Sequence, residues 1–305
     1  MSTTPLVSIL INNYNYANYV PNAISTALGQ SYDRIEVIVV DDGSRDESRD
    51  VISGFSDRVK AVFKQNGGQG SAFNAGFAAS QGDIICFLDA DDYCAPNKIA
   101  QVVKQFQERP EAGWLFHQLQ RVDAEGTPLA SHSLDLEDSF VDFRDPILRG
   151  QPVRALMPAT SGLCFRRDVL TKTLPMPEQL RISADNYLRL SAISRYPGIL
   201  SSEKLAFHRI HGANNYEAKN NTSYLHGETN IQTSYYLRKL FPETGAFTEQ
   251  LFSHSLGQLV GHRELAKVRQ IPELASYLKE YFSLQTWLRN SPRILVNIAK
   301  ASLST

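Results

Sequence analysis

Acidic side chains crowd together directly after an apolar run at residues 84–88. Asp89, Asp91 and Asp92 occupy three of the four positions that follow it. Carboxylates held this close repel one another, and the pKa of at least one rises unless a cation lies among them. Oxygen ligands favour a hard divalent ion, Mg²⁺ or Mn²⁺, of the kind that bridges to diphosphate oxygens. The alternative is a solvated acidic turn stabilised by the dipole of a following helix.

A second acidic pair, Asp41 and Asp42, follows the apolar run at residues 35–40 and precedes Gly43. A carboxylate at this point can accept hydrogen bonds from a nucleobase imide or a ribose hydroxyl. Alternatively, Asp42 only supports the turn at Gly43 and the dipole of the next helix. The residues alone leave both interpretations open.

Glycines are concentrated within residues 66–76, which read NGGQGSAFNAG. Glycines that open a helix let backbone N–H groups approach a ligand. The segment is not a dinucleotide-binding fingerprint, because Phe73 occupies the third glycine position. It is not a P-loop either, since no Gly-Lys-Ser/Thr follows. By itself the segment does not identify a ligand.

Alternating strands and helices must position these groups. Apolar, β-branched runs typical of strands buried on both faces occur at residues 6–11, 35–40, 59–63 and 84–88. Ser44 and Glu47 form a capping-box pattern that predicts a helix after the second run. Pro96 predicts the start of another helix, whose apolar stripe is Ile99, Val102, Val103 and Phe106. The alternation predicts an α/β fold with a mostly parallel sheet flanked by helices, which binds ligands at the carboxyl ends of its strands.

The later chain has a looser pattern. Its predicted elements are a strand with a turn at Glu125 and Gly126, an irregular segment at 130–160, a strand at 161–166 and a helix at 181–195. Strand patterns end near residue 222. An amphipathic helix is then indicated by Leu274, Tyr277, Leu278, Tyr281 and Phe282. We therefore predict a helical C-terminal extension over residues 222–305.

The overall composition is that of an ordinary globular protein. The 305 residues carry a net charge of −1 and are 42% hydrophobic and 21% charged. This near-neutral balance argues against nucleic acid as a partner, because nucleic-acid binders usually carry a basic face. Three cysteines form neither a disulfide framework nor a zinc pattern, which favours a reducing compartment. No leader peptide and no membrane-spanning run is predicted, so the expected location is cytoplasmic.

The order of the motifs resembles that of the family-2 nucleotide-sugar glycosyltransferases, which have the GT-A fold. The resemblance rests on VSILINNYN, VIVVDDGS, the glycine-rich segment and GDIICFLDADD with Pro96 after it. It is close over residues 5–110 and looser to about residue 215. It implies a GT-A glycosyltransferase domain over residues 1–221, with a nucleotide-binding half at 1–112 and an acceptor half at 113–221.

The resemblance also implies roles for individual side chains. Asp91 and His211 would bind the metal, although a lone histidine is also compatible with a structural role. Asp185 would be the general base, with Ala184 in place of the usual glutamate. Without the resemblance, Asp185 also fits a helix N-terminal cap. The nucleotide-binding residues would be Asn12, Tyr14, Asp41, Asp42, Gly68 and Asp89.

The implied activity is that of an inverting, hexosyltransferase-like enzyme that uses Mn²⁺ or Mg²⁺. It would move a sugar from a nucleoside diphosphate sugar, with UDP expected, to a hydroxyl of a saccharide or lipid-linked acceptor in surface polysaccharide or glycoconjugate synthesis. Peripheral contact of the C-terminal helices with the inner face of the membrane stays open, as does a homo-oligomer. A non-catalytic nucleotide-sugar binding or scaffold protein also stays open, because Phe73 and Ala184 replace an arginine and a glutamate of many members.

Overall fold

The chain divides into two compact units. The computed structural model describes residues 4–55, 57–130, 137–153, 157–212, 214, 222–261, 270–282, 286, 288, 290–292, 294–296 and 298. The first unit consists of Met1–Asp142 and Arg154–Gly212, and the second of Phe143–Val153 and Ala213–Thr305. The predicted domain end at residue 221 lies outside the described residues.

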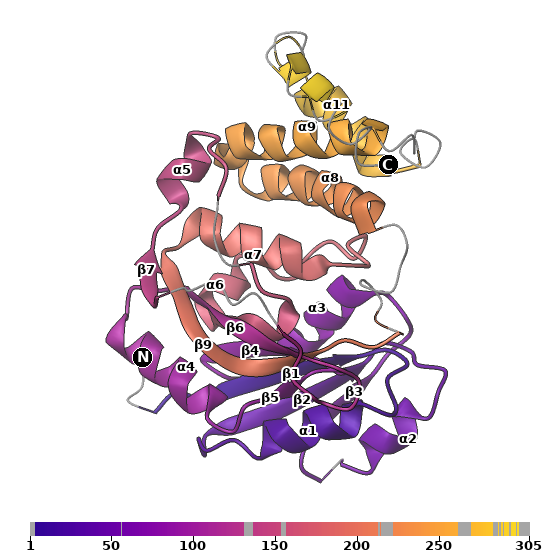
Figure 1. The fold of residues 1–305 in the computed structure, drawn as a ribbon, viewed down its shortest axis with the longest axis vertical. Helices are drawn as coiled ribbons and strands as arrows, with labels where there is room; N and C mark the ends of the chain where they lie inside the picture. The colour runs from indigo at the N-terminus through magenta and orange to yellow at the C-terminus, as the bar shows by residue number, and fades with distance from the viewer. Residues whose placement is uncertain are drawn as a thin grey trace. The chain divides into compact units, whose positions relative to one another are not determined.

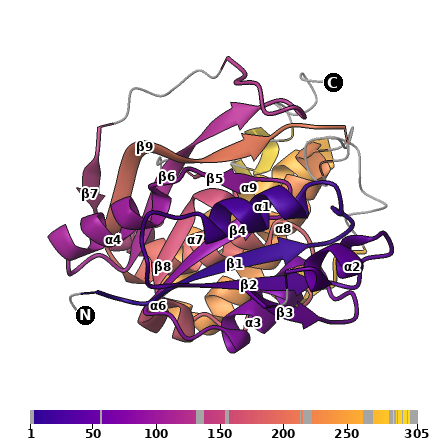
Figure 2. The same cartoon turned by 90° about the horizontal axis from the view of Figure 1, so that it is seen from below.

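The centre of the first unit is a parallel sheet made by the predicted N-terminal strands. They are β1 (Val7–Asn13), β2 (Ile35–Asp41), β3 (Lys60–Phe63) and β4 (Ile84–Asp89). Their order is β3-β2-β1-β4, and each neighbouring pair is parallel. Figure 2 shows β1 and β2 side by side and pointing the same way. Because the register pairs Asn13 with Asp41 and Asn12 with Asp89, the polar residues of three strands end at one edge.

Later strands extend this sheet with mixed polarity. They are β5 (Tyr93–Cys94), β6 (Trp114–Val122), β7 (Ser139–Val141), β8 (Leu163–Arg166) and β9 (Gly198–Arg209). β8 runs antiparallel to both β4 and β6, β9 runs parallel to β6, and β5 and β7 pair antiparallel with β9. The α/β fold with a parallel central sheet is confirmed. The sequence patterns did not predict β5, β7 or β9.

Helices cover both faces of the sheet (Figure 1). They are α1 (Val20–Leu28), α2 (Ser48–Ser53), α3 (Gln69–Ala79), α4 (Lys98–Glu108), α6 (Arg167–Thr171) and α7 (Ala184–Arg195). The predicted stripe of α4 is confirmed, because Ile99, Val102, Val103 and Phe106 are all buried in the main core. That core also contains the inward side chains of α1, β1 and β4. In Figure 1, α3, α6 and α7 lie on the other face of the sheet from α1.

The predicted capping box is wrong. α2 begins at Ser48, and its N-cap is Glu47, which makes no side-chain capping bond. The Ser44 hydroxyl instead accepts the Asn15 backbone N–H at 2.9 Å and an Asn13 side-chain N–H at 3.1 Å. Gly43, with φ of 74°, turns the chain toward the end of β1, so the hydroxyl serves that strand end and not the helix.

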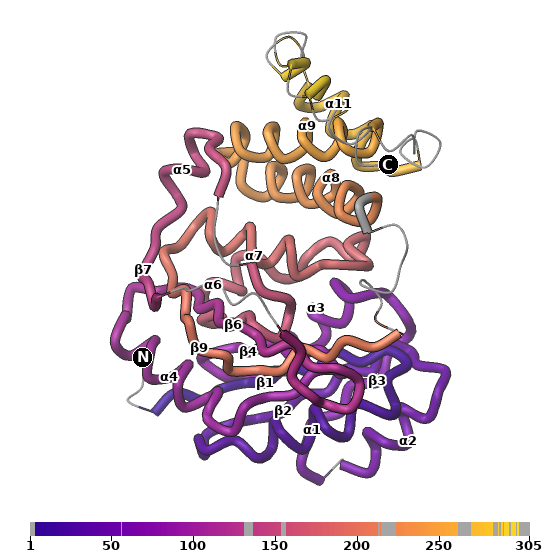
Figure 3. Tube along the Cα trace, viewed as in Figure 1, coloured from indigo at the N-terminus to yellow at the C-terminus, as the bar shows by residue number. Residues whose placement is uncertain are grey.

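The second unit is helical in its described residues, as the C-terminal pattern predicts. It contains α5 (Arg144–Leu148), α8 (Thr222–Leu240), η2 (Pro242–Thr244), α9 (Gly245–Gly261) and α11 (Pro272–Tyr281). α8 and α9 lie side by side (Figure 3). Leu274 and Tyr277 of α11 are buried as predicted, whereas Leu278 is 38% exposed. None of the described helices combines the length and apolar character needed to cross a bilayer.

α3 is docked through its N-terminus onto the segment that leads into α7. The Gln69 backbone N–H donates to the Arg181 carbonyl at 2.9 Å, and that of Gly70 donates to the Leu180 carbonyl at 3.0 Å. Gly68, just before the helix, has φ of 87°, and a Cβ built there would lie 2.7 Å from the Arg181 Cα. Position 68 therefore requires glycine on two grounds, backbone conformation and close approach.

Substituting Gly68 with alanine should destabilise the first unit. The positive φ alone costs a non-glycine residue about 1–3 kcal/mol, and the clash with Arg181 adds to it. We expect Gly68→Ala to lower the melting temperature clearly in a calorimetric scan. Gly212→Ala is the control, because a Cβ at that position meets nothing within 4 Å. Equal melting of the two variants would contradict the tight docking of α3.

Candidate active site

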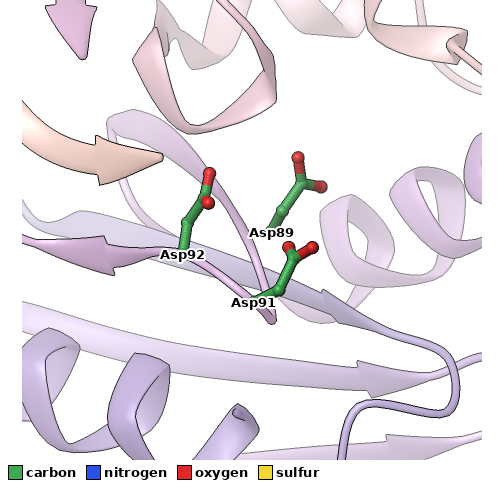
Figure 4. Close-up of side chains that lie close together, drawn as sticks. All are labelled: Asp89, Asp91 and Asp92. Carbon is green, nitrogen blue, oxygen red and sulfur yellow. The ribbon is translucent and has the colours of Figure 1, made fainter. Parts of the chain in front are cut away.

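The acidic cluster lies where β4 ends. Asp89 is the last residue of β4, and Asp91 and Asp92 follow in the turn before β5. Each of the three residues offers a carboxylate oxygen, and these oxygens lie within 4.8 Å of one another. In Figure 4 the three side chains stand on the same side of the turn. The acids that the sequence singles out are therefore brought together in space.

The electrostatics of the cluster favour a bound cation. Burial raises the pKa of Asp89 well above its ordinary value, and the charges of Asp91 and Asp92 raise it further. Burial also raises the pKa of Asp91, partly offset by the hydrogen bond from His211. A hard divalent ion relieves such repulsion and is bound best by carboxylate oxygens. The donor set therefore fits Mg²⁺ or Mn²⁺.

His211 lies beside Asp91, as the resemblance implies. Its Nε2 is 3.1 Å from Asp91 Oδ2, and its side chain is only 4% exposed. The imidazole stacks on the Tyr19 ring at 4.5 Å and meets Tyr16 edge-on at 5.6 Å. The ring is thus held in place by aromatic packing, with one nitrogen directed at the acidic cluster.

Arg209 supports the same turn from β9, a role that the sequence patterns do not reveal. Its backbone N–H donates to Asp92 Oδ1 at 2.9 Å, and its Nε donates to the Asp91 carbonyl at 3.0 Å. The guanidinium carbon lies 5.2 Å from the Tyr19 ring centre and 5.1 Å from that of Tyr93. The pairing of β9 with β5 and with β6 brings this residue to the acids.

Asn12 connects β1 to the acidic turn. Its side-chain N–H donates to Asp89 Oδ1 at 2.7 Å, and its backbone carbonyl accepts the Ala90 backbone N–H at 3.2 Å. The buried Asn12 Oδ1 has no hydrogen-bond partner among the described residues. A ligand hydroxyl or N–H can use this acceptor. Tyr14, also predicted to contact the nucleotide, is half-buried just beyond the end of β1.

Asp41 and Asp42 are both buried, and both make several bonds within the protein. Asp41 accepts an Asn13 side-chain N–H at 2.9 Å and the Ser44 backbone N–H at 3.1 Å, which joins the ends of β1 and β2. Asp42 pairs with Lys64 Nζ at 2.6 Å. It also accepts the backbone N–H groups of residues 67 and 68 at 2.9 and 2.7 Å. The Asp42 carboxylate thus holds the segment before α3, whereas the carboxylate that bonds into the turn at Gly43 is that of Asp41. The nucleotide contact of Asp42 stays a prediction.

Three backbone N–H groups of the glycine-rich segment already have partners within the protein. The Gly68 N–H is bound to Asp42, and those of Gln69 and Gly70 are bound to the carbonyls of residues 181 and 180. The interpretation of this helix start as an open ligand cradle is therefore wrong for these three groups. The segment instead joins Asp42 to the region before α7. Lys64 completes this arrangement and had no signal in the sequence patterns.

Asp185 lies in the first turn of α7. Ser183 is the N-cap residue, in a left-handed conformation with φ of 52°, so the interpretation of Asp185 as the cap is wrong. Asp185 Oδ2 pairs with Arg189 at 3.1 Å, and Arg189 also donates to the Pro158 carbonyl. Asp185 lies close enough to the cluster for its charge to raise the pKa of Asp89. The predicted base and the predicted metal site thus share one region.

Acids gathered at the carboxyl ends of parallel strands lie where open α/β sheets bind their ligands. Residues 8–170 match the model of Glycosyl transferase family 2, and the chain belongs to this family.

Two relatives and two solved structures extend the comparison. An uncharacterized glycosyltransferase of Nostoc sp. is 40% identical over 215 residues, which is 69% of this chain and 66% of the relative. One of Rickettsia prowazekii is 47% identical over 96 residues, which is 32% of this chain and 30% of the relative. The chain therefore matches less than two thirds of either relative's length.

The structural likeness is to GT-A enzymes. Residues 1–349 of S. aureus TarS, in complex with UDP-GlcNAc, superpose with a TM-score of 0.61 at 14% identity, covering 90% of this chain and 91% of that one. The Pyrobaculum calidifontis mannosyltransferase PcManGT, in complex with GDP-Man and Mn²⁺, superposes with a TM-score of 0.56 at 14% identity. That match covers 100% of this chain and 89% of the other. At this identity, the likeness establishes the fold.

The raised pKa of Asp89 has a measurable effect on stability. The pKa of Asp89 in the folded state lies above its unfolded value of about 3.9. Protonated Asp89 therefore makes its full contribution to the free energy of unfolding below about pH 4. That contribution is lost as the pH rises through the folded-state pKa. Without divalent ions, Asp89→Asn should therefore melt above the wild type at pH 7, and the difference should shrink toward pH 4. Asp57→Asn, at a side chain that is 81% exposed, controls for the loss of one charge. Equal melting temperatures of Asp89→Asn and the wild type at pH 7 would contradict the raised pKa of Asp89.

Proposed function

We propose that the protein is an inverting glycosyltransferase that moves a sugar from a nucleoside diphosphate sugar to an acceptor hydroxyl. The observation that carries the proposal is the gathering of Asp89, Asp91 and Asp92 at the end of β4, where their carboxylate oxygens lie within 4.8 Å of one another. The charge of Asp185 contributes to the raised pKa of Asp89. Family membership supports glycosyl transfer. A base beside a diphosphate-binding cation is the minimum machinery of a single displacement.

The donor is proposed to be a UDP-sugar, with a GDP-sugar as the principal competitor. TarS has been solved with UDP and with UDP-GlcNAc, and PcManGT with GDP-Man and Mn²⁺. In this chain Asn12, Tyr14, Asp41, Asp42 and Gly68 are proposed to bind or frame the nucleoside. The unpartnered Asn12 Oδ1, beside Asp89, supports a contact to a ligand hydroxyl in this region.

The chain's own residues would perform the proton transfer and the binding. Asp185 would accept the proton of the acceptor hydroxyl as that oxygen attacks the anomeric carbon, and Arg189 would orient the carboxylate through their ion pair. Asp91 and His211 would hold Mn²⁺ or Mg²⁺, with Asp89 nearer the ribose. The bound ion would neutralise charge on the departing diphosphate as a Lewis acid.

The acceptor is proposed to be a saccharide or a lipid-linked saccharide, and the context surface polysaccharide or glycoconjugate synthesis. The proposed location is the cytoplasm, with peripheral contact of the C-terminal helices at the inner face of the membrane. Self-association is part of the same proposal. These statements depend on the family relationship by analogy, because one fold serves many acceptors.

A specific observation keeps a non-catalytic binding or scaffold role as the second candidate. Phe73 replaces an arginine of many relatives, and here its ring is 2% exposed and packs on Phe87 at 4.8 Å. Ala184 replaces the usual glutamate, is fully buried, and donates its backbone N–H to Gln69. Neither position supplies a polar side chain to a ligand. A binding protein would retain the donor and lack transfer.

A thermal-shift panel of UDP-, GDP- and dTDP-sugars, each with and without Mn²⁺, tests the donor and the metal together. Ligand at about 100 times its Kd stabilises the native state by about 2.7 kcal/mol, so the true donor should raise the melting temperature by several degrees. We expect the largest shift with a UDP-sugar plus Mn²⁺, and loss of the Mn²⁺-dependent part in Asp91→Asn. A GDP-sugar giving the largest shift would redirect the donor assignment. If the donor raises the melting temperature equally with and without Mn²⁺, donor binding does not depend on the metal, and the proposed metal role is wrong.

Asp185→Asn separates catalysis from binding. Loss of a general base should lower kcat about 10²- to 10⁴-fold while the donor-induced thermal shift stays intact. The rate is measured as release of the nucleoside diphosphate in the presence of acceptor. Asp168→Asn is the matched control, because Asp168 is likewise the second residue of its helix but is exposed. Unchanged transfer by Asp185→Asn would refute the base assignment, and donor binding without any transfer by the wild type would favour the scaffold role.

A further inference from the structure

Asp92 differs from the other two acids of the cluster, because its carboxylate is fully engaged inside the protein. Oδ2 accepts the Ser161 hydroxyl at 2.5 Å, and Oδ1 accepts the Arg209 backbone N–H at 2.9 Å. His208 Nδ1 lies 3.2 Å from Oδ1. The side chain is completely buried. A carboxylate with this many donors around it is an anchor for the turn and has little capacity left for an ion.

Ser161 connects the two ends of the acidic turn through one hydroxyl group. Its Oγ donates to Asp92 and at the same time accepts the backbone N–H of Asp89 at 3.1 Å. Ser161 is fully buried in the 3-10 turn η1 (Thr160–Gly162). The distance between the first and last acids of the cluster is thus set by a residue about 70 positions later in the chain.

Lys98 in turn holds Ser161. It is the first residue of α4, is fully buried, and donates from Nζ to the Ser161 carbonyl at 2.8 Å. Its positive charge also interacts with Asp92. A buried ammonium is costly unless it is paired and hydrogen-bonded. Here that cost is offset by the Ser161 carbonyl, which accepts the hydrogen bond, and by the negative charge of Asp92.

We propose that Ser161 and Lys98 are positioning residues that preset the acidic turn, so that Asp91 meets the divalent ion and Asp89 the ribose, with Asp92 as the anchor and not a ligand. This inference rests on the proposed metal-dependent function. Residues that orient metal ligands typically change metal affinity about 10- to 100-fold when they are removed. Loss of the Ser161 hydroxyl frees the Asp89 backbone and the Asp92 side chain together, so the position of Asp91 between them is no longer maintained.

The chain offers a matched control for Ser161. Ser8 is also fully buried, donates to a carboxylate, Glu36 Oε1, at 2.5 Å and accepts a backbone N–H, that of Gly82, at 2.8 Å. Ser8 lies near the amino end of β1, whereas the acidic cluster lies at the carboxyl end of the neighbouring β4. Ser8→Ala therefore removes an equivalent hydroxyl without touching the site.

The experiment measures binding of Mn²⁺ alone to the full chain, by the electron paramagnetic resonance signal of free Mn²⁺. We expect Ser161→Ala to weaken Mn²⁺ binding about 10- to 100-fold, and Ser8→Ala to bind as the wild type does. Ser161→Thr, which keeps the hydroxyl, should recover most of the affinity. Wild-type affinity in Ser161→Ala would overturn the proposal, and so would an equal loss in Ser8→Ala. A wild type that binds no Mn²⁺ would instead refute the metal dependence itself, and this inference with it.

Lys98→Met provides a second variant in case Ser161→Ala does not fold. It keeps the length of the side chain and removes the donor to the Ser161 carbonyl. We expect Mn²⁺ binding to weaken about 10-fold, at the lower end of the range for such orienting groups. Asp92→Asn keeps an acceptor for its neighbours and should weaken Mn²⁺ binding far less than Asp91→Asn does. Equal losses in the two asparagine variants would make Asp92 a ligand and overturn its assignment as the anchor.

Discussion

Repulsion among buried carboxylates at one edge of the sheet is the constraint on which the rest of the structure depends. Five acids lie at the ends of β2 and β4, and the groups around them supply compensating charge or donors. Lys64 pairs with Asp42, which also accepts two backbone N–H groups, and Asp92 accepts the Ser161 hydroxyl and the Arg209 backbone N–H. Asp89 is the least compensated of the cluster. The nearly neutral chain thus conceals a strongly acidic cluster, whose internal repulsion a divalent cation would relieve.

The parallel half of the fold could be predicted from the sequence because its strands are rich in apolar, β-branched residues, although Ser8, Glu36 and Lys60 interrupt the runs and β3 is half-buried or exposed. β9 could not, because its alternation is interrupted and its place depends on pairing with β6, about 80 positions earlier. β5 is only two residues long and has no pattern of its own. Ser44 shows that a local pattern can also mislead. Its hydroxyl bonds to Asn13 and Asn15, at the end of β1 and just after it, and does not cap the helix.

The acids of the candidate site could also be predicted, because they are adjacent in the sequence and follow recognisable strands. The groups that hold them could not. Lys98 occupies a helix whose visible pattern is its apolar stripe, and Ser161 is one serine among many until the fold brings it against Asp92. Arg209 donates its backbone N–H to Asp92 and its Nε to the Asp91 carbonyl, partners that lie more than 100 positions earlier in the chain.

The bonds between the start of α3 and the segment before α7 have an evolutionary consequence. The segment whose N–H groups bind Asp42 continues into Gln69 and Gly70. The N–H groups of these two residues donate to the carbonyls of residues 181 and 180, which lie shortly before Asp185. On the proposed function, a substitution here that altered the nucleoside contact would also disturb the segment that leads into the helix of the proposed base. Donor preference and turnover would then be linked at this place, and new specificities would arise more readily through residues outside the glycine-rich segment.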